Sequence, residues 1–299
     1  MSKWTIEDMP NLKGKIAIVT GGNKGLGYRS TLEFAKHGAT VVIGCRDEAQ
    51  GLIAKDKITK EVPNADIDVI QLDLLDKSVI EKFAHLFIEK YDHLDILLNN
   101  AGVVNLEFLR RTEDGREMHM ATNHLGHFML TGLLLPVLKK TDNPRIVTIS
   151  CGSYKFGVID FEDFDWKNRP YDRSKCYGDS KLANMLFMRG LQSRFDKAGI
   201  EAVSLSAHPG LTGTERQQTM GIGGGLSKMI ASPIETGFAP FMMATTYEKL
   251  KGKELIGPKY FFRGHPVVNK ISGLALDDQL ADALWSFSEK ITGIQYDFN

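Results

Sequence analysis

Tyr177 and Lys181 stand four residues apart, a spacing that places both side chains on one face of a helix. Hydride transfer to or from a carbonyl carbon needs a matching proton transfer at the oxygen, which a tyrosine hydroxyl can perform. An unperturbed tyrosine has a pKa of about 10, too high for an efficient base at neutral pH, and a nearby ammonium lowers it. The pair therefore predicts acid–base chemistry at an alcohol or a carbonyl. A tyrosine packed beside a surface lysine is the alternative.

A glycine-rich turn lies between an apolar run at 15–20 and a helical pattern at 27–37. Glycines there let the backbone approach a pyrophosphate closely, and the following helix offers free N–H groups and the positive end of its dipole. This position, after a buried strand and before a helix, favours a dinucleotide site over an ordinary surface turn. The residues expected to contact the cofactor in this turn are Gly21, Asn23, Lys24, Gly25, Leu26 and Gly27.

The choice of cofactor is predicted from charge. Sites for NAD place an acid about 20 residues beyond the glycines, to hold the ribose 2′-hydroxyl. Here that position, just after the second apolar run, holds Arg46. A guanidinium binds a 2′-phosphate through charge-assisted contacts, and Lys24 adds a second positive charge. The sequence therefore predicts NADP(H), with two solvated surface cations as the alternative interpretation.

Three motifs, in this order along the chain, resemble those of the short-chain dehydrogenase/reductase family: Gly-x-x-x-Gly-x-Gly at 21–27, Asn-Asn-Ala-Gly at 99–102 and Tyr-x-x-x-Lys at 177–181. The resemblance extends from Gly14 to about Gly293. Three further segments are similar to the retinol-dehydrogenase-like branch of that family: 123–128, 181–184 and 208–210.

The resemblance implies roles for several residues outside the glycine turn. Asn123 would belong to a water-linked proton relay through Lys181, although an Asn in an apolar helix can also simply cap or bend it. Asp73 resembles the family's adenine-contacting acid. The cofactor contacts implied beyond the glycine turn are Asp73, Leu74, Asn100, Ala101, Gly102, Tyr177, Lys181, Pro209, Gly210, Thr212 and Thr214. A glycine-rich stretch within about 212–232 matches the family's mobile substrate-covering loop.

One position departs from the family's pattern. A serine that orients the substrate oxygen is expected as the second of two adjacent serines after the strand at 145–150, and that position is Cys151. A thiol is a weaker hydrogen-bond donor than a hydroxyl. Ser150 cannot replace it without a bulge, because neighbouring residues of a strand point to opposite faces. Three outcomes stay open: Ser153 substitutes from the following loop, Cys151 serves poorly, or the protein is a weak enzyme.

The elements that must position these residues alternate strictly between strand and helix. Strands are predicted at 15–20, 39–44, 67–72, 94–98, 145–150 and 202–206, and helices at 27–37, 48–61, 77–90, 121–140 and 177–197. Each crossover between parallel strands needs a helix. The sequence therefore predicts a single α/β domain over 1–299, a doubly wound, Rossmann-like parallel sheet with helices on both faces.

Composition excludes several other classes of protein. The 37 basic and 37 acidic residues give a net charge of zero, which argues against a large nucleic-acid footprint. No apolar stretch approaches the length of a transmembrane span. Three cysteines give no disulfide framework, so a cytoplasmic protein is expected. His119, His124 and His127 do not share one helix face, so packing or polar roles are expected rather than a metal site.

These inferences predict an NADP(H)-dependent alcohol dehydrogenase or carbonyl reductase. Its partner would be a small alcohol, aldehyde or ketone, lipophilic by the branch resemblance, and a homodimer or homotetramer is typical of the family. The alternative is a nucleotide-binding regulatory or scaffold protein with the same fold and impaired chemistry, suggested by Cys151.

Overall fold

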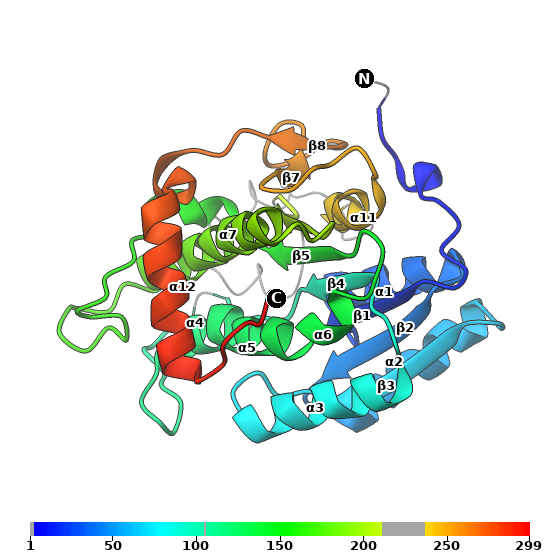
Figure 1. Ribbon diagram of the computed structural model, residues 1–299, viewed down its shortest axis with the longest axis horizontal. Coiled ribbons are helices and arrows are strands. Elements are labelled where there is room, and N and C mark those ends of the chain that lie inside the picture. Colours follow the sequence, from blue (N-terminus) through cyan, green and yellow to red (C-terminus); the bar gives the residue numbers. More distant parts are fainter. Residues whose placement is uncertain (1–2, 105, 211–236) are drawn as a thin grey trace.

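The computed structural model describes residues 3–104, 106–210 and 237–299. Eight strands form one sheet in the order β3-β2-β1-β4-β5-β6-β7-β8 (Figure 1). The strands are β1 Ile16–Thr20, β2 Thr40–Cys45, β3 Asp66–Gln71, β4 Ile96–Asn99, β5 Arg145–Ile149, β6 Val203–Ala207, β7 Leu255–Pro258 and β8 Pro266–Asn269. All neighbours are parallel except β7 and β8, an antiparallel pair at one edge. The predicted doubly wound α/β fold is confirmed. The antiparallel edge is a feature that the sequence reasoning had not assigned.

Successive residues of the central strands enter two different apolar layers. In β1, Ile18 packs into one layer, while Ala17 and Val19 pack into the other. All three are fully buried. Burial on both faces is why these strands are continuous apolar runs rather than alternating patterns.

Helices cover both faces of the sheet (Figure 1). One face carries α1 Gly25–Lys36, α2 Glu48–Glu61 and α11 Ala239–Thr246. The other carries α3 Lys77–Lys90, α5 Gly126–Leu133 and α7 Arg173–Ala198, with α12 Asp278–Thr292 packed against α7. Among the residues described, no helix is both long and apolar enough to cross a membrane.

The helix expected at 121–140 is divided into several pieces. It consists of α4 Met118–Met120, a π-helical turn at Ala121–Leu125, then α5, and finally α6 Leu135–Leu138. The π turn is closed by a hydrogen bond from the Gly126 N–H to the Ala121 carbonyl. The later break coincides with Pro136, which has no N–H to continue the ladder. Periodicity predicts the helical character of this segment but not these interruptions.

The helix that carries Tyr177 and Lys181 begins earlier than the sequence predicted. It starts at Arg173, because the Asp172 carboxylate caps it by accepting the N–H groups of Ser174 and Lys175. It ends where Gly199 takes the left-handed conformation.

Two buried histidines near the π turn make the stability of the fold sensitive to acid. Burial lowers the pKa of His124 to about 3 and that of His127 to about 4. Both are neutral in the native state, whereas an unfolded histidine titrates near 6.5. We therefore expect the free energy of unfolding to be fully retained above pH 6.5. It should decrease as the pH falls toward 4, by up to about 1.4 kcal/mol per pH unit for each histidine.

Chemical denaturation at several pH values between 7.5 and 5 tests this expectation. Asp179 acts in the opposite direction below pH 6, because burial raises its pKa to about 6 and the native state then holds a proton that the unfolded chain releases. A comparison of wild type with His124→Asn cancels that contribution. The variant should lose stability with a shallower pH slope, and equal slopes would show that His124 is not the titrating group.

Candidate functional site

The residues predicted to bind the cofactor gather at the carboxyl ends of the parallel strands. The strands β1 and β4 are neighbours in the sheet. From β1 the strand order continues outward through β2 and β3 on one side, and from β4 it continues through β5 and β6 on the other. In open α/β sheets ligands bind in the crevice at such a switch point. The glycine turn follows β1, and the Asn-Asn-Ala-Gly segment follows β4.

The glycine turn is packed too closely for side chains. A Cβ atom at Gly27 would lie 2.3 Å from the Gly21 carbonyl oxygen and 2.5 Å from Nδ2 of Asn100. Gly25 has a φ of +58°, the left-handed conformation that glycine adopts without strain. At the N-cap of α1, Lys24 makes no side-chain cap hydrogen bond within the described residues. The turn and the N–H groups of the first helical turn thus fit a pyrophosphate.

The hydroxyl of Thr20 joins the glycine turn to the segment after β4. It accepts the N–H groups of Asn100 and Ala101, each at 2.9 Å, and lies 2.9 Å from Nε2 of His127. The other ring nitrogen of His127 donates to the carbonyl oxygen of Asn123, at 3.1 Å. His127 therefore carries its proton on Nδ1 and accepts the Thr20 hydroxyl proton on Nε2. The sequence predicted a packing or polar role for His127, and the structure shows that its polar role joins the glycine turn to the π turn.

Arg46 follows β2 directly and is exposed. It lies near the glycine turn, because β1 and β2 pair in parallel with Thr20 opposite Gly44. The next residue, Asp47, accepts the N–H of Gln50 and caps α2. The Asp47 carboxylate is thus engaged in capping the helix. The charged group at the position expected to recognise the adenosine ribose is therefore the Arg46 guanidinium.

The segment after β3 lies against the helix layer. Leu74 is buried, and a Cβ atom at Gly126 would lie 2.4 Å from the Leu74 carbonyl oxygen. Asp73 is half-buried and accepts the N–H of Leu75 at 3.0 Å.

After β6 the chain turns at Pro209 and Gly210, and Gly210 has a φ of +70°. The two expected contacts Thr212 and Thr214, and the predicted loop at 212–232, lie outside the described residues.

Tyr177, Lys181 and Asn123 come together from α7 and the π turn. Nζ of Lys181 lies 5.5 Å from the centre of the Tyr177 ring and donates to the Ile149 carbonyl at 3.0 Å. A Cβ atom at Gly102 would lie 2.7 Å from Oδ1 of Asn123 and 4.0 Å from Nζ of Lys181. The three side chains therefore form one buried group, and the half-buried end of the Asn-Asn-Ala-Gly segment lies against it.

Asn123 is held rigidly in this group. Its Oδ1 accepts the N–H of Val103 at 2.8 Å, and its Nδ2 donates to the Val103 carbonyl and to Oγ of Ser180, both at 3.0 Å. The amide fastens the backbone after β4 to α7. The π turn that contains Asn123 is a local distortion of the kind often found at functional sites.

The three residues in question after β5 have different environments. Oγ of Ser150 donates to the Lys181 carbonyl at 3.0 Å and is thereby engaged with α7. Cys151 is a half-buried free thiol at the N-cap of a 3₁₀ turn, Gly152–Phe156. Within that turn, the hydroxyl of Ser153 is buried and has no hydrogen-bond partner among the described residues. The Ser153 carbonyl packs on Gly178, the residue after Tyr177.

The turn between β7 and β8 closes over the same edge of the sheet. Phe261 has a φ of +66°, an unusual backbone conformation for an aromatic residue. Its ring lies 4.6 Å from the ring of His208, and a Cβ atom at Gly152 would lie 2.6 Å from it. Phe261 thus lies beside the segment that holds Cys151 and Ser153. No motif in the sequence pointed to it.

A compact group of Glu117, His119 and Cys176 lies beside Tyr177. Their potential ligand atoms all lie within 4.8 Å of one another, and all three residues are buried. Burial alone would raise the pKa of Glu117, but hydrogen bonds from His119 and from the backbone outweigh it and lower that pKa. Burial raises the pKa of the Cys176 thiol. Sequence reasoning missed this group, because Cys176 is remote from the other two along the chain.

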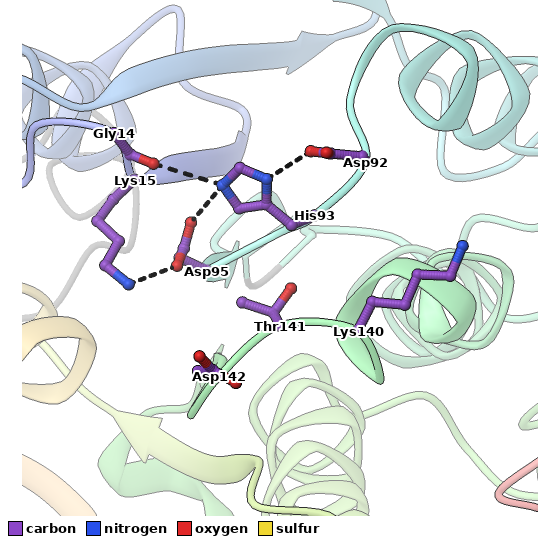
Figure 2. Close-up of a pocket in the computed structure, with 8 residues that line it drawn as sticks. All are labelled: Gly14, Lys15, Asp92, His93, Asp95, Lys140, Thr141 and Asp142. Carbon is purple, nitrogen blue, oxygen red and sulfur yellow. Dashed lines mark hydrogen bonds and ion pairs between the residues drawn. The ribbon is translucent and has the colours of Figure 1, made fainter.

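A cavity of about 460 Å³ lies at the opposite, amino-end edge of the sheet (Figure 2). Four of the charged groups that line it pair with one another: Asp95 accepts from Nζ of Lys15 at 2.9 Å, and His93 contacts both Asp92 and Asp95. Asp95 also accepts the N–H of Ile16 at 2.9 Å, at the start of β1. The network ties the beginnings of β1 and β4 together and is remote from the predicted site residues.

Comparisons with known proteins agree with this geometry. Residues 15–164 match the family model for short chain dehydrogenase. Human retinol dehydrogenase 13 is 35% identical over 294 residues, which cover 95% of this chain and 86% of that protein. The structure of an uncharacterised protein from Mycobacterium paratuberculosis has a TM-score of 0.84 and 34% identity, and the match covers 99% of this chain and 100% of that one. A short chain dehydrogenase of Shigella flexneri 2a, complexed with NADP, shares the fold at a TM-score of 0.67 and 21% identity, over 84% of this chain and 99% of that one.

Proposed function

Since the chain belongs to the short-chain dehydrogenase family, in its retinol-dehydrogenase-like branch, we propose that it is an NADP(H)-dependent oxidoreductase that interconverts an alcohol and an aldehyde or ketone. The observation that carries the proposal is the buried group of Tyr177, Lys181 and Asn123 at the carboxyl edge of the sheet. The same edge holds the glycine turn.

The proposed chemistry assigns distinct tasks to these side chains. The nicotinamide, when bound, supplies or accepts the hydride. Tyr177 acts as general acid and base at the substrate oxygen. The ammonium of Lys181, fixed by the Ile149 carbonyl, favours the ionised form of a neighbouring phenol. Asn123 holds the backbone of Val103 beside them and takes part in a proton relay through Lys181. Pro209 and Gly210 complete the cofactor contacts after β6.

The NADP(H) preference is supported by the charge around the glycine turn. Arg46, which follows β2, and Lys24, the N-cap of α1, are exposed cations that would border the adenosine ribose. A guanidinium can bind a 2′-phosphate through two parallel hydrogen bonds. A structural neighbour complexed with NADP shares the fold, which is compatible with the preference.

Arg46→Ala should weaken NADP(H) binding much more than NAD(H) binding. Loss of a charge-assisted phosphate contact costs roughly 1.5–3 kcal/mol, or about ten- to a hundredfold in affinity. Fluorescence titration of wild type and variant with both reduced cofactors measures the difference. Lys57→Ala, which removes one exposed positive charge from α2, is a matched control and should have little effect. Equal losses for the two cofactors would contradict the proposal.

The proposed substrate class is supported by the branch, whose curated relatives include retinol dehydrogenases 12, 13 and 14. We expect a lipophilic alcohol, aldehyde or ketone. The direct test is to mix the protein with NADPH and a panel of aldehydes and ketones, and to follow the nicotinamide absorbance. Absence of turnover across aliphatic, aromatic and polyene carbonyls would contradict the assignment and favour a binding function.

The proposal includes a cytoplasmic location and a homodimer or homotetramer. Cys45, Cys151 and Cys176 are all free thiols, which is compatible with a reducing compartment. Cell fractionation tests the location, and light scattering tests the oligomeric state.

A further inference from the structure

His119 is a fully buried histidine whose two ring nitrogens have fixed, different roles. Nε2 accepts the N–H of Leu106 at 3.2 Å, so it carries no proton. Nδ1 therefore carries the proton and donates to Oε1 of Glu117 at 2.8 Å. The carboxylate of Glu117 also accepts the N–H groups of His119 and Met120, which caps α4. Glu117 thus fixes both the helix start and the orientation of the imidazole.

The imidazole contacts the proposed catalytic tyrosine. Its ring centre lies 5.8 Å from that of Tyr177, with the planes tilted by 59°. Nδ1 also lies 3.7 Å from Sγ of Cys176, the residue before Tyr177. His119 therefore packs against the first turns of α7 at the position where the phenol must be held.

The same imidazole fastens the backbone after the Asn-Asn-Ala-Gly segment. The peptide groups of Leu106 are bound on both sides, because its carbonyl accepts the hydroxyl of Tyr171 at 2.7 Å. Three residues earlier, Val103 is held through both its N–H and its carbonyl by Asn123. Val103 and Leu106 thus stand shortly after the proposed cofactor contacts Asn100, Ala101 and Gly102 in the chain.

We propose that His119, oriented by Glu117, is a positioning residue that sets the Tyr177 ring and the Leu106 backbone relative to each other. The inference rests on the proposed function of Tyr177. The proposal assigns His119 no contact with the cofactor or the substrate, and His119 acts through the two elements that it joins. A displacement of about 1 Å at such a point can cost on the order of 10²-fold in rate.

Glu117→Gln is a sharp test, because it changes the hydrogen bonding without changing the size of the side chain. In either orientation of the new amide, its NH₂ group faces a backbone N–H that the carboxylate now accepts. The imidazole should lose its fixed orientation and release Leu106. We expect amide exchange at Leu106 to become about tenfold faster, as for the loss of one hydrogen bond. The kcat should fall about 10- to 100-fold, with NADPH affinity unchanged.

Substitutions of His119 itself separate its two contacts. His119→Ala should lower kcat at least as much as Glu117→Gln. His119→Gln can place its carbonyl oxygen near the position of Nε2, so it should restore part of the activity and of the Leu106 protection. His119→Phe keeps a ring against Tyr177 but loses both hydrogen bonds, and Leu106 should exchange as fast as in the alanine variant.

His124→Asn is the matched control. His124 is another buried histidine of the same helical segment, and its Nε2 bonds to Oγ of Ser288 at 2.8 Å rather than to any proposed site residue. It should lose stability while kcat and the Leu106 exchange rate stay at wild-type values. If His119→Ala and Glu117→Gln lower kcat no more than this control does, the positioning role is wrong, although the proposed function stands.

Two measurements do not depend on turnover. One is the amide exchange rate of Leu106, and the other is the NMR chemical shift of an isotope-labelled Tyr177 ring, which reports the position of that ring. If wild type fails to turn over any carbonyl, the proposed function is wrong. The positioning of Tyr177 and Leu106 by His119 would then still be decided by these two signals. If the Leu106 exchange rate and the Tyr177 ring signal both stay at their wild-type values in Glu117→Gln and in His119→Ala, the positioning role of His119 is wrong.

Discussion

Tyr177→Phe is expected to abolish turnover while leaving NADPH binding nearly intact. The variant removes only the hydroxyl, so the ring still packs against His119 and near Nζ of Lys181. Proton transfer by a positioned side chain contributes about 10²–10⁴-fold to rate, and the loss should reach that range. Stopped-flow turnover with NADPH and an active aldehyde gives the rate, and fluorescence titration gives the affinity.

Tyr91→Phe is the control for this experiment. Tyr91 is the C-cap of α3, away from the site, and its hydroxyl donates to Asp68 of β3. The variant therefore makes the same chemical change at a remote hydroxyl. Its activity should equal that of wild type. Substantial residual turnover in Tyr177→Phe would mean that another group transfers the proton. A wild type that binds NADPH but shows no turnover would favour the regulatory or scaffold alternative.

Ser153→Ala should lower kcat by on the order of 10²–10³-fold, the cost of losing one donor to a developing oxyanion. This loss is expected because the wild-type Ser153 hydroxyl is buried and has no hydrogen-bond partner within the described part of the chain. A buried donor without a partner is costly, and a substrate oxygen would satisfy it. Cys151→Ala, at the half-buried thiol, should change the rate little.

The reverse order would assign the role to the thiol, and Cys151→Ser should then raise the rate by supplying a stronger donor. Ser206→Ala serves as a control, because that hydroxyl donates to the Thr148 carbonyl inside the sheet. Full activity in both Ser153→Ala and Cys151→Ala would show that neither side chain orients the substrate.

Much of the fold could be predicted because its signals are local. Buried strands of a parallel sheet are continuous apolar runs, and the glycine turn lies between such a strand and a helix. The elements after β6 were not assigned. β7 ends in Pro258, and β8 is a short edge strand beginning with Pro266, so neither has the alternation or the length of a strong strand signal.

The candidate site was predictable where a motif carries it and not where tertiary contacts build it. The spacing of Tyr177 and Lys181 placed both on one helix, as the structure has them. Nothing local, however, brings Glu117 to Cys176, or Phe261 to Gly152. The first contact joins the N-cap of α4 to the first turn of α7, and the second joins the turn after β7 to the turn after β5. Their residue types are ordinary in any buried position.

The π turn at Ala121–Leu125 fixes the angle about the helix axis between the side chains that precede it and those that follow it. His119, before the turn, faces Tyr177, whereas His127, after it, bonds to Thr20 of the glycine turn. Each residue of an α-helix advances the phase by about 100°. Deletion of a single residue that restored a regular α-helix would therefore rotate one histidine away from its partner. The length of this segment should therefore be constrained as strictly as the identity of Asn123 within it.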